Sequence, residues 1–199
     1  MKYVFLFFTI LLGSMCANAD SPQPPGLLES LNYEADGEKF RAEAILDDGN
    51  DCDLVIYNIK NEKDPILLVR KNDFLTCTSR TDVAGRIHRF KLNSHGGLQA
   101  SSTWAESGVG RDHWDETITI VHRNGKIWVG GYSYKTEDDI TGYRHDCDVN
   151  YLSGHEDIID RSDSREPTYH YHLKINTPIP LLSTWSKDHQ PPRCKPAEN

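Results

Sequence analysis

Basic residues are in short supply in this sequence. It contains 22 Lys and Arg against 30 Asp and Glu, which gives a formal net charge of -8 and a pI of about 5.5. A protein that binds nucleic acid needs a basic face for the phosphates, and adhesion to an anionic membrane needs basic clusters. The composition therefore excludes a nucleic-acid partner and attachment to an anionic membrane surface.

A long apolar segment is also lacking. The apolar run at residues 4–12 is too short to span a bilayer, and no other stretch approaches membrane length. Lys2 before this run and the small residues Ala17 and Ala19 after it complete the pattern of a secretory signal peptide. We therefore expect residues 1–19 to be a signal peptide, the mature protein to be periplasmic or secreted, and no integral membrane segment to remain.

Two consequences follow from removal of the leader. The alternative of a lipoprotein would use Cys16 as the anchor, and Met15 is a poor residue before a lipidated cysteine. Only Lys2 among the charged residues lies in the leader, so the mature chain carries 21 basic and 30 acidic residues, a formal charge of -9.

Cysteine is infrequent, with five residues in all, and four remain after the leader. An even number in an exported chain indicates two disulfides, with three possible connectivities. Cys52 and Cys77 lie almost symmetrically about a turn at 61–65, so paired strands could bring them together. We therefore predict the pairs Cys52–Cys77 and Cys147–Cys194, the second clamping the C-terminal tail onto a strand at 143–152.

Helical periodicity is nearly absent. One short helix is expected from Gly26 to Asn32, where Leu27, Leu28 and Leu31 would share a face. From residue 40 onward the apolar pattern has a period of two, and turns interrupt it every eight to twelve residues. The predicted strands cover residues 40–46, 53–59, 65–69, 74–78, 86–92, 98–103, 117–122, 126–134, 143–152 and 168–175.

Turn residues complete the fold prediction. Asn124-Gly125 between two strand-like runs is typical of a type I′ hairpin, and Gly130-Gly131 indicates a bulge or bend within a strand. Strands joined by short turns favour an all-β fold, an antiparallel sandwich or partly open barrel of about 8–10 strands. We expect a Pro-rich lead with the short helix at 20–39, a single β domain at 40–176, and an irregular Pro-rich tail packed on it at 177–199.

Recognised catalytic motifs are missing. The sequence contains no H-E-x-x-H metal motif, no G-x-S-x-G nucleophile motif and no glycine-rich phosphate loop. The sequence therefore favours a non-enzymatic function over an enzymatic one.

Nine histidines keep a metal site open. His170 and His172 are two residues apart on a predicted strand, so both imidazoles point to the same face. They could share a zinc ion with His88 or His122 as a third ligand, which would make the protein a metal-dependent hydrolase. The alternative is a solvent-facing strand in which His and Tyr alternate.

The acidic segment at 47–53 raises the possibility of calcium, because carboxylates on a tight loop suit a hard cation. Its spacing does not match an EF-hand loop, and a polar turn explains the same composition. We therefore expect no cofactor, with calcium or zinc as the alternatives.

Aromatic and acidic residues gather in segments that we predict to be loops. Exposed aromatics beside charges suit a recognition surface, so we expect the binding residues to be Trp104, Glu106, Asp112, Trp114 and Asp115. Trp185 also falls in a predicted loop. Such tryptophans could instead cover the ends of the sandwich, or bind a small ligand or glycan.

Three segments carry a family resemblance: D-L-V-I-Y at 53–57, K-I-W-V-G-G-Y-S-Y at 126–134 and V-N-Y-L-S-G at 149–154. Over roughly residues 40–175 the chain resembles a family of uncharacterised exported proteins of Gram-negative bacteria. The resemblance implies an exported location and an all-β fold, and it brings no activity. The acidic turn departs from the repeated Asp spacing of that family, which counts against calcium binding.

An acidic, disulfide-bonded β domain with aromatic loops suits a protein that binds another protein. Acidic inhibitors associate quickly and specifically with basic enzymes through complementary fields. We therefore expect an exported inhibitor or immunity-type protein, whose partner is an exported hydrolase or a toxin.

Overall fold

The computed structural model describes residues 26–46, 51–77, 87–105, 112–186 and 189–194. Over these residues the chain is almost entirely β, with eleven strands and a single turn of 3-10 helix, η2 (Pro192–Cys194). Two antiparallel sheets are formed, and they do not close into a barrel. The predicted all-β fold is confirmed.

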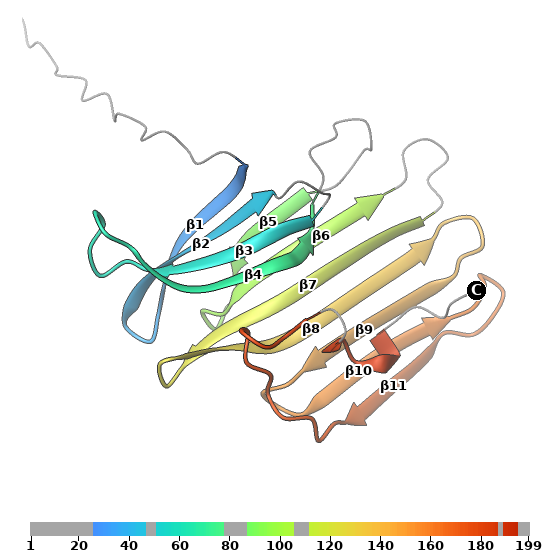
Figure 1. Cartoon of the computed structure of the whole chain (residues 1–199). Helices are drawn as coiled ribbons and strands as arrows, with labels where there is room; N and C mark the ends of the chain where they lie inside the picture. Colours follow the sequence, from blue (N-terminus) through green and yellow to red (C-terminus); the bar gives the residue numbers. More distant parts are fainter. Residues whose placement is uncertain (1–25, 47–50, 78–86, 106–111, 187–188, 195–199) are drawn as a thin grey trace, which may run out of the picture.

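Each sheet is a meander in which every strand pairs with its neighbour in the sequence (Figure 1). The four-stranded sheet contains β1 (Leu27–Ala35), β2 (Glu38–Leu46), β3 (Asp51–Asn58) and β4 (Ile66–Thr76). The seven-stranded sheet contains β5 (Ile87–Leu92), β6 (Leu98–Ala105), β7 (Asp112–Arg123), β8 (Lys126–Asp138), β9 (Arg144–Asn150), β10 (His155–Arg161) and β11 (Tyr169–Lys174). Short antiparallel connections of this kind need no crossover helix.

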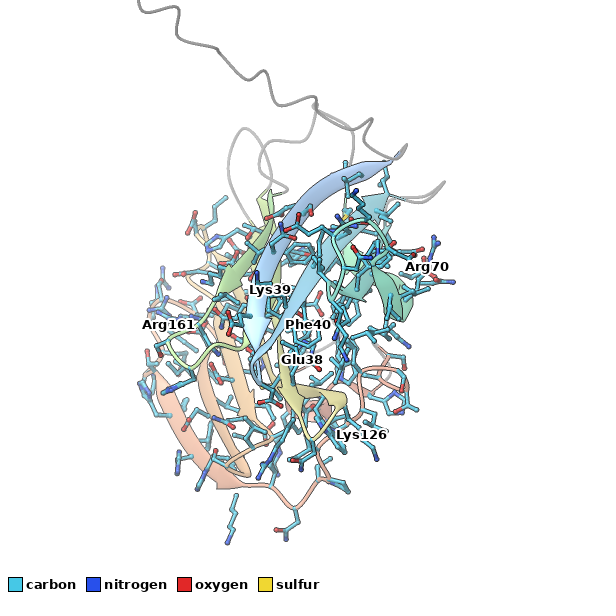
Figure 2. The ribbon with its side chains drawn as sticks, turned by 90° about the vertical axis from the view of Figure 1, so that its left-hand side faces the viewer. Glu38, Lys39, Phe40, Arg70, Lys126 and Arg161 are labelled. Carbon is cyan, nitrogen blue, oxygen red and sulfur yellow. A yellow bond between two sulfur atoms is a disulfide. The ribbon has the colours of Figure 1, made fainter. Side chains whose placement is uncertain are left out.

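The core lies between the two sheets. The four-stranded sheet covers one face of β5 to β7, and side chains fill the space between the layers (Figures 1 and 2). Leu54 and Ile56 of β3 and Ile118 and Ile120 of β7 are fully buried there. We call this covered side of the seven-stranded sheet its inner face.

The C-terminal segment completes the cover of the inner face. The amide of Val129 donates to the carbonyl of Pro180 (2.9 Å), and the amide of Leu182 donates to that of Ile127 (3.0 Å). Trp185 is 1% exposed and packs against Phe74 of β4, with ring centroids 5.6 Å apart. The tail therefore belongs to the core.

Both predicted disulfides are present, and the predicted pairing is confirmed. Cys52 at the start of β3 is bonded to Cys77, which follows β4, and Cys147 of β9 is bonded to Cys194 in η2. The second bond joins the C-terminal segment to the middle of the seven-stranded sheet, as the sequence predicts.

The predicted hairpin and bulge are also confirmed. Asn124 and Gly125 have φ of 54° and 69°, as a type I′ turn requires, and Figure 2 shows Lys126 at this hairpin. The register between β7 and β8 shifts at Gly130, where an added Cβ would lie 2.9 Å from Cγ1 of Val121. Glycine is needed there because the neighbouring strand approaches so closely.

The predicted helix at residues 26–32 is wrong, because these residues form most of β1. Burial alternates along the strand, with every second residue from Leu27 to Ala35 facing inward. Leu27 and Leu31 therefore share a face that excludes Leu28, which is the period of a strand. Asp36 and Gly37, both with positive φ, then turn the chain into β2.

Other boundaries also differ from the sequence prediction, and three of the differences matter here. The runs at 65–69 and 74–78 belong mainly to one continuous strand, β4. Strand β10 was not predicted, because its sequence HEDIIDR is mostly polar. Strand β7 begins at Asp112 rather than at residue 117, which changes the location of the predicted binding residues.

Candidate functional site

The second face of the seven-stranded sheet is polar and is not covered by another layer of the described residues. In β7 the buried residues Glu116, Ile118 and Ile120 alternate with Thr117 and Thr119, which are only partly buried. Successive residues of a strand point to opposite faces, so the second set defines the outer face of this sheet.

The strand register arranges the outer face in rows. Directly paired residues of antiparallel strands point to the same side, so each row crosses the sheet from strand to strand. One row consists of Ser101, Thr117, Ser133, Asp148, Asp157 and His172. The next row consists of Thr103, Asp115, Lys135, Asp146, Ile159 and His170.

An open cleft of about 580 Å³ lies on this face across β5 to β9. It is lined by Lys91, Gln99, Ser101, Thr103, Asp115, Thr117, Ser133, Lys135 and Asp148. None of these described residues is aromatic, and their charges balance, with two lysines and two aspartates. The cleft therefore offers hydrogen bonds and paired charges to a ligand, and none of its described lining residues offers an aromatic ring for stacking.

Two of the hydroxyl groups in the cleft hold each other in place. The Ser101 and Thr117 side chains lie directly opposite across β6 and β7, and their oxygens are 2.9 Å apart. Cross-strand hydroxyl pairs of this kind stabilise a sheet and fix the rotamers involved. The centre of the cleft is thus preorganised for hydrogen bonding.

The pKa of the Asp148 carboxylate, on this face, is raised above its ordinary value. Although the residue is exposed overall, loss of hydration raises the pKa of its carboxylate; Lys135 opposes this effect and the neighbouring Asp157 adds to it. The Asp157 effect follows from the register, since Asp148 and Asp157 are directly paired across β9 and β10. A cationic group placed beside this pair would relieve the repulsion.

The five predicted binding residues do not form one loop surface. Glu106 lies outside the described residues, whereas Trp104 ends β6 and Asp112, Trp114 and Asp115 begin β7. Trp104 is the backbone partner of Trp114, and the adjacent residues Trp114 and Asp115 of β7 point to opposite faces. The prediction of a loop is therefore wrong for these strand residues, and only Asp115 contributes to the cleft.

The tryptophans whose side chains are described serve packing more than recognition. Trp114 is half-buried on the inner face and stacks on Tyr134, with ring centroids 6.4 Å apart. Trp185 is in the core, and the Trp128 indole nitrogen donates to the Arg123 carbonyl (3.2 Å). This placement favours the alternative in which the tryptophans cover the ends of the sandwich.

The four candidate zinc ligands are not brought together. His88 lies on β5 and His170 and His172 lie on β11, the two opposite edges of the seven-stranded sheet. His122 lies on β7, where its imidazole contacts the buried Phe40 and Tyr33 from the four-stranded sheet. The predicted grouping of His170 and His172 with either of the other two histidines is therefore wrong.

His122 has a specific structural partner. Its Nε2 lies 2.7 Å from the Tyr33 hydroxyl, and its ring is 3.9 Å from that of Phe40. Burial lowers the pKa of His122 to about 4, against an opposing effect of Asp36 and Glu38. At neutral pH the ring is therefore uncharged and bonded within the core.

The acidic segment proposed for calcium is only partly described, since residues 47–50 lie outside the described ranges. Asp53 is 4% exposed, accepts a hydrogen bond from Arg70 Nε (2.7 Å), and accepts a second from the Asp73 amide (3.3 Å). A carboxylate held by a guanidinium is already compensated. Asp53 therefore serves structure rather than a cation.

One compact group of metal-type ligands occurs among the described residues, and it does not constitute a metal site. Cys147, Glu156 and Cys194 lie together, but the two cysteines form a disulfide and carry no thiolate. The buried Glu156 instead lies 3.8 Å from Arg193 of the C-terminal segment. This cluster therefore fastens the tail.

In the described ranges, no helix is long and apolar enough to cross a membrane. Comparisons with protein-family models, curated proteins and solved structures yield no match. The resemblance to exported proteins of Gram-negative bacteria therefore stays a prediction. The function has to be argued from the residues and their arrangement.

Sequence reasoning missed most of the cleft, although a signal for it was present. Ser101, Thr117, Ser133 and Asp148 lie in strands that were predicted, whereas Lys135 lies one residue beyond the predicted strand at 126–134. Alternation assigns each residue to a face of its own strand. Which residues of different strands stand side by side depends on register, which the sequence pattern did not supply.

Proposed function

We propose that this chain is an exported, non-enzymatic binding protein that recognises a partner protein through the outer face of its seven-stranded sheet. An inhibitor or immunity-type protein is the class that fits, with an exported hydrolase or a toxin as partner. The observation that carries the proposal is the open polar cleft at Lys91, Asp115, Lys135 and Asp148 on that uncovered face.

The dimensions of the face suit a protein partner. Seven strands at about 4.8 Å spacing, with bounds that make them six to thirteen residues long, give a surface about 30 Å across and about 20–40 Å along the strands. A standard protein interface buries about 800 Å² on each partner, which is of the same order. The whole face, rather than the cleft alone, is therefore large enough for a specific complex.

The chemistry of the face also favours a protein over a glycan. Sugar rings bind by stacking on aromatic side chains, and no described residue of the cleft is aromatic. Charged groups of both signs, separated by hydroxyls, instead match the polar contacts that fix the register of two proteins. The hydrolase alternative loses support because its histidines lie on distant strands.

The overall charge contributes at longer range. A formal charge of -8 attracts a basic partner and raises the rate of association, while the balanced cleft determines how the two proteins fit. The two disulfides and the leader-like segment at 1–19 support an oxidising compartment outside the cytoplasm.

A pair of charge exchanges tests the proposal. Asp115 and Lys135 are directly paired across β7 and β8, so Asp115→Lys with Lys135→Asp keeps the net charge and the local attraction while it reverses the pattern seen by a partner. As the matched control, Lys63→Asp with Asp64→Lys makes the same exchange in an exposed turn of the four-stranded sheet.

Each variant of residues 20–199 is immobilised and incubated with the exported protein fraction of the source cells, and captured proteins are quantified by mass spectrometry. The wild type and the control exchange are expected to retain the same partner. The outer-face exchange is expected to capture at least about tenfold less of this partner, which corresponds to a loss of about 1.4 kcal/mol in binding free energy. Equal capture by the outer-face exchange, or no retained partner, contradicts the proposal.

A further inference from the structure

Strands β10 and β11 lie at one edge of the seven-stranded sheet (Figure 1). They carry a second group of polar side chains on the outer face. Asp157 of β10 is directly paired with His172 of β11, and His155 lies two residues before Asp157 on the same side of the strand. The cleft described above does not include any of these three residues. The group therefore lies outside the cleft, at the edge of the face that we propose for protein binding.

Contacts within this group orient one imidazole. His172 Nδ1 is hydrogen-bonded to a carboxylate oxygen of Asp157. An ionised carboxylate only accepts hydrogen bonds, so the proton lies on Nδ1 and the lone pair of a neutral His172 is on Nε2. A carboxylate that holds Nδ1–H in this way is the usual outer partner of a histidine that binds a metal through Nε2.

The second imidazole is close to the first. The rings of His155 and His172 are 5.1 Å apart and nearly parallel, with an interplanar angle of 20°. Parallel rings do not point their nitrogens at a common atom, so a metal ion requires the rings to turn toward each other. The His172 side chain is 68% exposed, and exposed side chains change rotamer within nanoseconds.

Negative charge next to the group favours a cation. Asp157 is flanked on β9 by Asp148, and the repulsion between these carboxylates contributes to the raised pKa of Asp148. A divalent ion beside them would relieve that repulsion. Imidazole nitrogens with a carboxylate are the ligands that zinc and its neighbours in the transition series select.

We propose that His155 and His172 bind a divalent transition-metal ion of the zinc class at the edge of the outer face, with Asp157 positioning His172. This site differs from the one that the sequence suggests, in which His170 shares the metal with His172. His170 lies on the same face, but its directly paired neighbour on β10 is Ile159, which offers no carboxylate.

The proposal is tested by calorimetric titration of zinc into tag-free protein with both disulfides intact. One equivalent is expected to bind, and His155→Ala and His172→Ala are each expected to weaken binding by at least about tenfold. Asp157→Asn is expected to weaken it by about 10–100-fold, because the outer carboxylate no longer orients His172. His170→Ala is the matched control, and its affinity is expected to stay within about twofold of the wild type.

A spectroscopic readout separates metal binding from a general effect on the fold. In imidazole nitrogen NMR spectra, zinc is expected to shift Nε2 of His172 while Nδ1 keeps its proton. Unchanged circular dichroism of each variant confirms that the edge strand still forms. The proposal is overturned if zinc does not bind, if His170→Ala loses as much affinity as His155→Ala, or if Asp157→Asn binds as tightly as the wild type.

Discussion

His122 joins the two sheets, and its protonation makes the stability of their packing depend on pH. Its imidazole comes from β7 and is enclosed by Tyr33 and Phe40 of the four-stranded sheet, so it joins the layers through ring contacts and a hydrogen bond. Burial lowers its pKa to about 4, below the ordinary value of 6.5. The folded state therefore favours the neutral ring.

This residue is expected to make the fold less stable in acid. Between pH 6.5 and 4 the unfolded chain binds the proton that folded His122 refuses, so stability falls as the pH is lowered through this window. After allowance for solvent near the ring, the loss is about 2 kcal/mol. Urea unfolding of wild type and His122→Phe at pH 7.0 and 4.5 measures it.

The comparison isolates His122 from the other titrating groups, because these are common to both proteins. His122→Phe is expected to be less stable at pH 7.0, since the Tyr33 hydroxyl loses its partner, but to lose less further stability on acidification. An equal loss of stability on acidification in the two proteins would show that folding does not depress the His122 pKa.

At the scale of elements, the C-terminal segment determines whether the inner face is covered. It adds backbone bonds to β8, places Trp185 in the core, and ends in the bond from Cys194 to Cys147 of β9. Gln190 Nε2 also donates to the buried Glu116 (2.9 Å). A Pro-rich segment without regular structure is thus held by many separate contacts.

Removal of the second disulfide is expected to loosen this segment. The bond closes a separation of 47 residues, for which chain entropy gives a stabilisation of about 4 kcal/mol as an upper value. Cys147→Ala with Cys194→Ala is expected to lower the free energy of unfolding by about 2–4 kcal/mol and to expose the tail to proteases first. Chemical denaturation and limited proteolysis measure these effects.

The matched control is Cys52→Ala with Cys77→Ala, which opens a separation of 25 residues between the two ends of a strand pair. That variant is expected to lose stability without early cleavage of the tail. Early tail cleavage in both variants, or in neither, would contradict a specific role of the Cys147–Cys194 bond in holding the C-terminal segment.

The elements that the sequence predicts well are those with a local signal. Asn124-Gly125 defines its hairpin because both turn residues accept positive φ, and the disulfide pairing follows from the turn between Cys52 and Cys77. Strand β1 was missed because adjacent leucines resemble a helical face, and β10 because polar residues occupy most of its positions. These two segments form strands because they pair with neighbouring strands, and a local sequence pattern does not report such pairing.

At the scale of the whole molecule, the outer face results from strand register. Asp115 was expected to act beside Trp114, yet the strand separates them onto opposite faces, and Lys135 and Asp148 become its neighbours instead. The sequence indicated an acidic, disulfide-bonded β protein without nucleic-acid or catalytic motifs. The proposed binding surface could be located only from the pairing of the seven strands, which brings its residues side by side.

Charge acts over two different distances in this molecule. The net charge of -8 acts over the distance at which proteins first meet, whereas the balanced charges of the cleft act only in contact. Raised salt is therefore expected to slow association with a basic partner more than it speeds dissociation. Both effects are expected of the proposed binding protein, whose specificity would reside on one sheet face.

Carboxyl footprinting of the free protein and of its captured complex determines which face of the molecule the partner covers. If the outer face is the binding surface, carbodiimide labelling of Asp115 and Asp148 is expected to fall by about fivefold or more in the complex, because interface carboxylates lose access to solvent. Asp64, in the exposed turn of the four-stranded sheet, is expected to label equally in both states. Unchanged labelling of Asp115 and Asp148 in a stable complex would contradict the account.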